Sequence, residues 1–219
     1  MAERKPMLGL TMGDPAGVGP EITVMALADE AVQKSCRPLV IGDAATMRAA
    51  VEIVGFEQEV VAVQDPSQAR FAPGSIEVLD LANVDLPRLN RGQVDPMAGK
   101  AAYEYVRKAV ELALAGQIEA VVTAPVNKEA LNAAGYHYSG HTEILADLCG
   151  SKDVAMMLVS GTLRVSHVST HVSLREACDR VRKARILKVI QLTYEALLRM
   201  GIENPHVAVA GLNPHASDG

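Results

Sequence analysis

Short apolar segments alternate with helical patterns along nearly the whole of the 219-residue chain. The strand-like segments are 8–12, 37–42, 59–63, 75–79, 118–123, 154–159, 163–169 and 205–210. Between most of them, apolar residues recur at spacings of three and four, as on one face of a helix. The clearest such helix is expected at 98–115. Strands that alternate with helices are typical of a largely parallel sheet, so the pattern predicts an α/β fold.

The segment 80–97 fits neither pattern and contains Pro87, Gly92 and Pro96. Prolines and glycines interrupt regular structure, so we expect a connection between two lobes there. The prediction places part of a first α/β lobe at residues 1–95 and a second at residues 96–219, with an approximate boundary. A chain of this length suits one large domain or two small ones.

Composition argues against several classes of protein. The net charge is −5, aromatic residues make up 3% and there is no Trp, so a nucleic-acid partner is disfavoured. No apolar run reaches membrane-spanning length, and we expect no membrane association. Cys36, Cys149 and Cys178 are widely spaced and odd in number, which favours small buried thiols in a reducing compartment, the cytoplasm.

Histidines follow two of the predicted strands. His171 lies where the strand 163–169 gives way to a helix that begins with the capping-box spacing of Ser173 and Glu176. His215 follows the last predicted strand after Asn213-Pro214. Imidazole is a common metal ligand, so each histidine is either a ligand or an ordinary structural residue. His167 could join His171 in chelating a metal, provided that the strand bends.

Polar residues also begin two predicted helices. Thr142 either caps the helix 143–148 or binds a phosphate at its N-terminus, with His141 adding a donor. Asn127 can likewise cap the helix that begins at Lys128. Lys128 is either a surface lysine or a group that holds a carboxylate or acts as an acid. A glycine turn at 13–19 between a strand and a helix is either an anion-binding loop or a structural turn, and it lacks both the dinucleotide and the Walker spacing.

Five motifs occur in a specific order: Thr11-Met-Gly-Asp-Pro-Ala-Gly-Val-Gly-Pro-Glu21, Thr123-Ala-Pro-Val-Asn-Lys128, Gly140-His-Thr-Glu143, Thr170-His171 and Gly211-Leu-Asn-Pro-His-Ala216. Together they closely resemble the PdxA family, the 4-hydroxythreonine-4-phosphate dehydrogenases of pyridoxal phosphate synthesis and their paralogues. The resemblance implies two lobes with a central cleft, similar to isocitrate and isopropylmalate dehydrogenases and unlike a Rossmann fold. It also implies a homodimer with a shared active site.

The same resemblance implies roles for individual residues. The family binds a divalent metal through three histidines, two of which match His171 and His215, and it binds substrate through residues matching His141 and Thr142. Family members run further than this chain, which implies C-terminal truncation and a third ligand beyond Gly219. Histidine ligands suit zinc, while manganese, cobalt and nickel stay open and magnesium is less natural. The cofactor is expected to be NAD, although no residue separates NAD from NADP.

Departures from the commonest family pattern indicate the substrate. Asn127 stands where the threonine-phosphate enzymes typically have His, and His167-Val-Ser-Thr-His171 replaces Ala-Thr-Thr-His. Both resemble paralogues that act on 4-phospho-D-threonate and 4-phospho-D-erythronate. The implied reaction is oxidation and decarboxylation of such a 3-hydroxy acid to dihydroxyacetone phosphate and CO2. Asn127 is then a substrate-binding residue, and Lys128 is the candidate catalytic residue that holds the carboxylate or relays a proton.

Three alternatives stay open. The first is 4-phosphohydroxy-L-threonine dehydrogenase of vitamin B6 synthesis, with the same chemistry on an amino-bearing substrate. The second is a dehydrogenase for a cyclic carboxylated diol, which needs no phosphate site. The third is a non-catalytic binding protein of the same fold.

Overall fold

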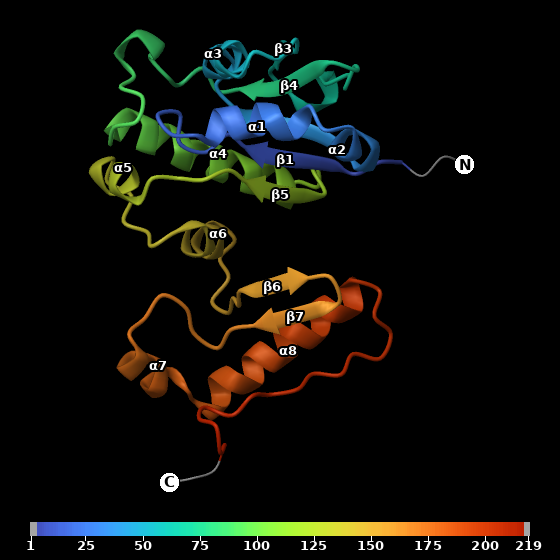
Figure 1. The fold of residues 1–219 in the computed structure, drawn as a ribbon, viewed down its shortest axis with the longest axis vertical. Coiled ribbons are helices and arrows are strands. Elements are labelled where there is room, and N and C mark those ends of the chain that lie inside the picture. The colour runs from blue at the N-terminus through green and yellow to red at the C-terminus, as the bar shows by residue number, and fades with distance from the viewer. Residues whose placement is uncertain (1–3, 217–219) are drawn as a thin grey trace. The chain divides into compact units, whose positions relative to one another are not determined.

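The computed structural model describes residues 4–216, and the chain divides into two compact units, with the boundary between Cys149 and Gly150 (Figure 1). The first unit is an α/β structure built on a parallel sheet, so the predicted fold class is confirmed. The boundary predicted near residue 95 concerns whole lobes and stays a prediction. The helix that begins there, α4 (Pro96–Leu114), packs against strands of the first unit.

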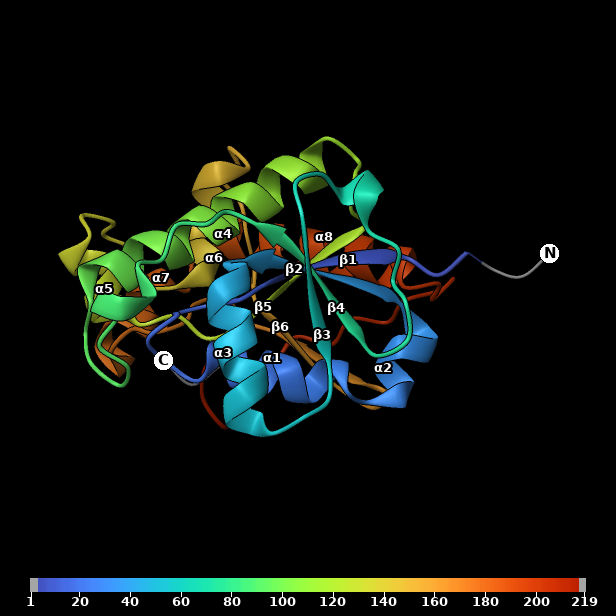
Figure 2. The same cartoon turned by 90° about the horizontal axis from the view of Figure 1, so that it is seen from above.

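The sheet of the first unit has five parallel strands in the order β3-β4-β2-β1-β5. The strands are β1 (Met7–Thr11), β2 (Arg37–Gly42), β3 (Glu59–Val63), β4 (Ser75–Asp80) and β5 (Ala120–Thr123). Figure 2 shows α4 on one face and α1 (Gly19–Leu27) and α3 (Ala44–Val54) on the other. Because parallel strands need crossover connections, helices cover both faces of the sheet, and the middle of β2, residues 39–41, is apolar and fully buried.

Three shorter helices complete the first unit. They are α2 (Glu30–Ser35), α5 (Lys128–Ala133) and α6 (His141–Leu148), and two 3-10 turns lie at Pro66–Gln68 and Leu86–Arg88. The helix predicted at 143–148 therefore begins two residues earlier, at His141. Consequently His141 and Thr142 lie in the first helical turn, where backbone N–H groups are exposed.

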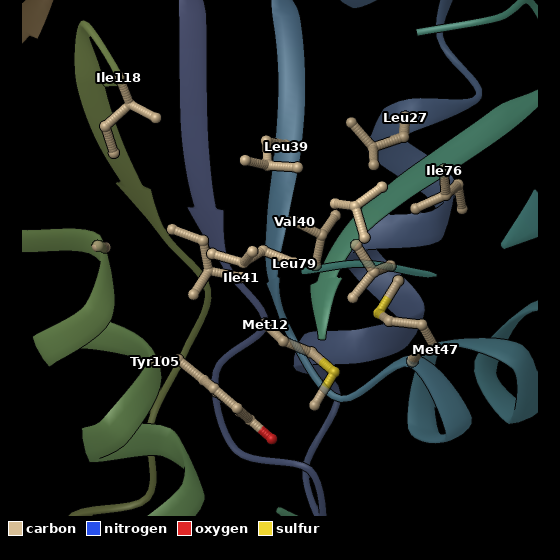
Figure 3. Close-up of a cluster of buried hydrophobic side chains, with 14 of the residues drawn as sticks. Met12, Leu27, Leu39, Val40, Ile41, Met47, Ile76, Leu79, Tyr105 and Ile118 are labelled. Carbon is tan, nitrogen blue, oxygen red and sulfur yellow. The ribbon is translucent and has the colours of Figure 1, made fainter. Parts of the chain in front are cut away.

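The core of the first unit lies between the sheet and these helices. Leu39, Val40 and Ile41 of β2 are fully buried, and Figure 3 shows them packed with methionines from neighbouring elements. The buried residues of this core are aliphatic or methionine, in keeping with the low aromatic content of the chain, with one exception. Tyr105 of α4 is fully buried, and its hydroxyl donates a 2.8 Å hydrogen bond to Asn83. A buried phenol needs such a partner to offset the loss of water.

The second unit contains an antiparallel pair, β6 (Met157–Ser160) and β7 (Leu163–Ser166), with helices α7 (Leu174–Arg180) and α8 (Lys183–Arg199). The hydroxyl of Thr193 on α8 donates to Ser166 at the end of β7, at 2.8 Å, which joins the helix to this strand. Ser173 accepts from the N–H of Glu176 at 3.2 Å, so the predicted cap of α7 is confirmed.

Several predictions about the second unit are wrong. The segment 205–210 forms no strand, because it lines a groove beside β7 and α8 without pairing with a neighbour. Alternating apolar residues indicate that one face of a segment is buried, whereas a strand also needs a neighbouring strand with which its backbone forms hydrogen bonds. The strand predicted at 163–169 ends at Ser166.

The cysteines also depart in part from expectation. Cys36 is buried as predicted, but Cys149 and Cys178 are exposed. Cys149 is the C-cap of α6, and α7, which contains Cys178, buries none of its residues. Within residues 4–216, no helix is both long and apolar enough to cross a membrane.

Candidate active site

The loops that follow β1 and β5 meet at the carboxyl end of the parallel sheet. Asp14 donates its backbone N–H to the carbonyl of Pro125 at 2.9 Å. Gly13 has a φ of 78°, and a Cβ there would lie 2.4 Å from the same carbonyl oxygen, so only glycine allows this approach. Two motifs distant in sequence, 11–21 and 123–128, are thereby adjacent, at the end of the sheet where α/β proteins bind ligands.

Asp14 accepts hydrogen bonds from backbone N–H groups within the turn at 13–19. The carboxylate of Asp14 accepts from the N–H of Ala16 at 2.8 Å, and burial raises the pKa of this carboxyl. Two backbone N–H groups of the turn are thus paired within it, because the N–H of Gly17 also donates to the carbonyl of Asp14, at 3.0 Å. This favours the structural interpretation of the turn over an anion-binding loop.

Asn127 caps α5, as predicted. Its side-chain oxygen accepts from the N–H groups of Glu129 at 2.9 Å and Ala130 at 3.1 Å. The oxygen is thus committed to the helix, and the amide NH2 is the part of Asn127 that is left to contact a substrate. Capping also fixes the position of Lys128, the first residue of α5.

Lys128 lies beside the loop that begins α6. A Cβ on Gly140 would lie 4.0 Å from the Cε of Lys128, so the aliphatic stem of this lysine runs past the glycine. Lys128 is exposed, which leaves its ammonium group accessible to a small anionic ligand. The structure therefore brings together Lys128 and the 140–143 motif, two features that the sequence analysis treated separately.

His141 is partly buried at the start of α6. Burial lowers the pKa of its imidazole below 6.5, while an interaction with the backbone of Ala124 acts in the opposite direction. Its Nε2 atom is buried and hydrogen-bonds to none of the described residues. Leaving a polar atom unpaired away from water costs about 1–3 kcal/mol. A ligand hydroxyl or phosphate that reached this nitrogen would remove that cost.

Thr142 does not cap α6, so that interpretation is wrong. The N-cap is Gly140, which has no side chain to cap with, and Thr142 is exposed in the first turn. The carboxylate of Glu143 turns back to accept from the N–H of Ser139 at 2.8 Å. The exposed hydroxyl of Thr142 and the N-terminal N–H groups together suit a phosphate, because both are donors and the helix dipole favours negative charge.

Tyrosines that were not predicted as site residues support the loop before α6. The rings of Tyr103 and Tyr136 stack at 3.9 Å, and Tyr138 donates a 2.6 Å hydrogen bond to Asp147 of α6. The interaction with Asp147 also raises the pKa of the Tyr138 phenol. The signal for them was present, since Tyr136 and Tyr138 directly precede the 140–143 motif in a chain with few aromatic residues.

The second unit contains the two histidines predicted as metal ligands. His171 is exposed and has a φ of 57°, the left-handed region that non-glycine residues rarely adopt. Such strain is often found at functional positions. His215 is exposed in a turn organised by Asn213, whose side-chain oxygen accepts from the N–H groups of His215 at 3.1 Å and Ala216 at 2.6 Å.

A complete metal site is not formed by the described residues. Among residues 4–216, no three His, Cys, Asp or Glu side chains come together as a metal-binding group would require. The proposed pairing of His167 with His171 also loses its basis. β7 ends at Ser166, so the two histidines do not share one face of a strand.

These features define a class: an α/β protein with a candidate small-molecule site at the carboxyl end of a parallel sheet. Within that class, residues 34–219 match the family model described as pyridoxal phosphate biosynthetic protein PdxA. The chain therefore belongs to the PdxA family, as its five ordered motifs predicted.

Individual relatives cover the whole chain. It is 42% identical over 218 residues, 100% of its length, to a Cupriavidus necator protein named D-threonate 4-phosphate dehydrogenase, of which it covers 65%. A solved structure named 4-hydroxythreonine-4-phosphate dehydrogenase from Burkholderia phymatum has 46% sequence identity and a TM-score of 0.89. The match covers 98% of this chain and 64% of the chain of that structure.

A more distant relative is a terephthalate 1,2-cis-dihydrodiol dehydrogenase from Burkholderia xenovorans. It shares 30% identity and a TM-score of 0.68, over 97% of this chain and 63% of its own. The chain thus spans less than two thirds of the length of each of these three relatives.

Proposed function

We propose that the whole protein is an NAD-dependent dehydrogenase that oxidises and decarboxylates 4-phospho-D-threonate or 4-phospho-D-erythronate. The observation that carries the proposal is the 42% identity, along the full chain, to a protein named D-threonate 4-phosphate dehydrogenase. The site agrees with such a substrate, because it offers donors for a phosphate and a cation for a carboxylate within one unit.

In the proposed reaction, hydride leaves C3 of the substrate for NAD, and the C3 hydroxyl loses its proton. The product is a 3-keto acid, in which the C1–C2 bond breaks to release CO2. A proton then joins C2 to give dihydroxyacetone phosphate. A carbonyl placed β to a carboxylate accepts the electron pair that decarboxylation leaves behind, so oxidation must come first.

The residues of the first unit have distinct roles in this proposal. Thr142 and the N-terminus of α6 bind the phosphate. His141 is neutral at pH 7, because its pKa is lowered, and orients the substrate through Nε2. Lys128 holds the carboxylate and supplies the proton to C2, and the amide NH2 of Asn127 contacts a hydroxyl. Lys128 and Thr142 are exposed, whereas a substrate must displace part of the surroundings of His141 to reach its buried Nε2.

A divalent metal belongs to the same proposal, with His171 and His215 as two of its ligands. Zinc suits imidazole donors best, with manganese, cobalt or nickel as alternatives and magnesium less suited. Because the described residues do not complete a ligand set, no step of the reaction is assigned to the metal.

The proposal extends to the assembly of the whole protein. We infer two lobes with a central cleft, of the isocitrate and isopropylmalate dehydrogenase type, and a homodimer that shares its active site in the cytoplasm. Support comes from the parallel sheet without a dinucleotide-binding glycine fingerprint and from the similarity to solved family members.

A second candidate is 4-phosphohydroxy-L-threonine dehydrogenase, favoured by the 46% identity to a structure with that name. This substrate carries an amine, for which a nearby carboxylate would be expected. Asn127 stands where the threonine-phosphate enzymes typically have His, which favours the hydroxy acids. A diol dehydrogenase is less well supported, because the relative of that kind is only 30% identical.

The experiment is a comparison of NADH formation with 4-phospho-D-threonate, 4-phospho-D-erythronate and 4-phosphohydroxy-L-threonine, with added divalent metal. We expect turnover of the two hydroxy acids and its loss in His171→Ala. Turnover of the amino compound alone would assign the protein to vitamin B6 synthesis. No turnover of any of the three, with metal bound, would leave the diol dehydrogenase or a non-catalytic binding protein.

A further inference from the structure

The second unit contains a basic pocket of about 520 Å³, and none of its cationic side chains has a role assigned above. Four cationic side chains line it: Lys152, Arg180, Arg182 and Arg185. The hydroxyl-bearing residues Ser169 and Thr170 form another part of its wall. All the residues that line it belong to the second unit, whereas His141 and Thr142 belong to the first.

The cations outnumber the acids that face them. Asp179 is the one acidic residue in the lining, and Glu176 forms a 2.6 Å ion pair with Arg180. Lys152, Arg182 and Arg185 form no ion pair with any described residue. The chain as a whole carries a net charge of −5, so a concentration of positive charge here is local and not a general property of the surface.

Two arginines are held in fixed orientations. Arg185 is half-buried and donates from Nε to the carbonyl of Val168 at 3.0 Å and from Nη2 to that of Val154 at 2.9 Å. Arg182 donates from Nε to the carbonyl of Asp179 at 2.7 Å. Bonds to neutral carbonyls leave the positive charge unneutralised. A guanidinium fixed in this way loses little further freedom when it binds an oxyanion.

We propose that this basic pocket binds a phosphate or pyrophosphate group of a small molecule. Guanidinium groups match the geometry of phosphate oxygens, and a lysine adds a flexible point charge. The hydroxyls of Ser169 and Thr170 supply further donors. Since Thr170 directly precedes His171, the bound group would lie next to a proposed metal ligand. Two sources share this chemistry: the diphosphate of a dinucleotide and the phosphate of the substrate.

The test is calorimetric titration of the protein with inorganic pyrophosphate at low salt. Lys152→Gln and Arg182→Gln should each weaken binding about tenfold, the usual effect of losing one charge-assisted hydrogen bond. Arg182→Lys, which keeps the charge, should restore part of the affinity. Lys183→Gln is the matched control, because Lys183 is the next residue to Arg182 but does not line the pocket. Thermal melting checks that each variant is folded.

Competition experiments then identify which molecule supplies the bound phosphate group. Displacement of pyrophosphate by NADH assigns the pocket to a dinucleotide, and displacement by 4-phospho-D-threonate assigns it to the substrate. The inference is overturned if pyrophosphate does not bind, or if Lys183→Gln weakens binding as much as the pocket variants do. It is also overturned if the folded pocket variants bind normally, as they would if pyrophosphate were held at the N-terminus of α6. None of these results depends on turnover, so they stand apart from the proposed reaction.

Discussion

The side chain of Lys128 lies beside Gly140, with its Cε 4.0 Å from the position that a Cβ on Gly140 would take. This contact joins the start of α5 to the start of α6, and it places a cation next to the residues proposed to bind phosphate. A cation for the carboxylate and donors for the phosphate are thus provided by adjacent segments of the chain.

Lys128→Met should lower kcat by about 100-fold, because general acid catalysis typically contributes that much. Lys128→Arg keeps the charge but does not readily give up a proton, so it should recover KM and not kcat. Steady-state kinetics with 4-phospho-D-threonate measure both constants. Unchanged kcat in Lys128→Met would exclude a role for this residue in proton transfer.

Thr142→Ala should raise KM for the phosphorylated acid by about tenfold, because a hydrogen bond to a charged group is lost. The free energy of unfolding should be little changed, since Thr142 is exposed and does not cap α6. Thr162→Ala, in the exposed turn between β6 and β7, is the control and should leave KM unaltered. Equal effects of the two substitutions would contradict a phosphate site at Thr142.

The buried imidazole of His141 should make stability depend on pH. Burial lowers its pKa below 6.5, so the unfolded chain takes up a proton more readily than the folded protein does. Stability should therefore fall as pH decreases from about 6.5 toward the lower pKa of the folded state. In His141→Gln this part of the pH dependence should disappear. Denaturant unfolding at several pH values makes the comparison, and parallel pH profiles for the two proteins would refute it.

The hydrogen bond from Tyr138 to Asp147 should support the loop before α6. Tyr138→Phe should destabilise the protein by at most about 1 kcal/mol, since the pair is exposed. Its effect should not add to that of Asp147→Asn, because both remove the same interaction. A double-mutant cycle in denaturant measures the coupling. Additive effects would show that the bond contributes nothing to the loop.

Gly99→Ala should be strongly destabilising, by at least about 2 kcal/mol. A Cβ on Gly99 of α4 would lie 2.1 Å from the carbonyl oxygen of Ala130, so α5 would have to move. Gly17→Ala is the matched control, because its Cβ would meet atoms only at ordinary contact distances of 3.5 Å and beyond. Chemical unfolding of both variants tests the difference, and equal stability would contradict the close packing of α4 on α5.

Much of the first unit could be predicted from the sequence because local patterns determine it. The apolar strand 37–42 and the regular spacing in the helix at 98–115 each indicated one element that the structure contains. The second unit was predicted less well. Segment 205–210 has strand-like alternation, but strand formation depends on a distant partner that no local pattern reveals.

The candidate site was also predicted only in part, because local features can be predicted and contacts between distant segments cannot. Asn127 was correctly predicted as a helix cap, because capping is a local property of three or four residues. The approach of Lys128 to Gly140 could not be predicted, because it depends on how α5 and α6 pack on α4. The pairing of Tyr138 with Asp147 is equally a consequence of tertiary packing, although the sequence placed the tyrosine near the motif.

The most direct test of the proposed reaction is product stoichiometry with 4-phospho-D-threonate as substrate. NADH, CO2 and dihydroxyacetone phosphate would be quantified in the same reaction at several times. The account predicts that the three form in a 1:1:1 ratio and that Lys128→Met slows all of them together. NADH without CO2, or no NADH from either phosphorylated hydroxy acid, would contradict it.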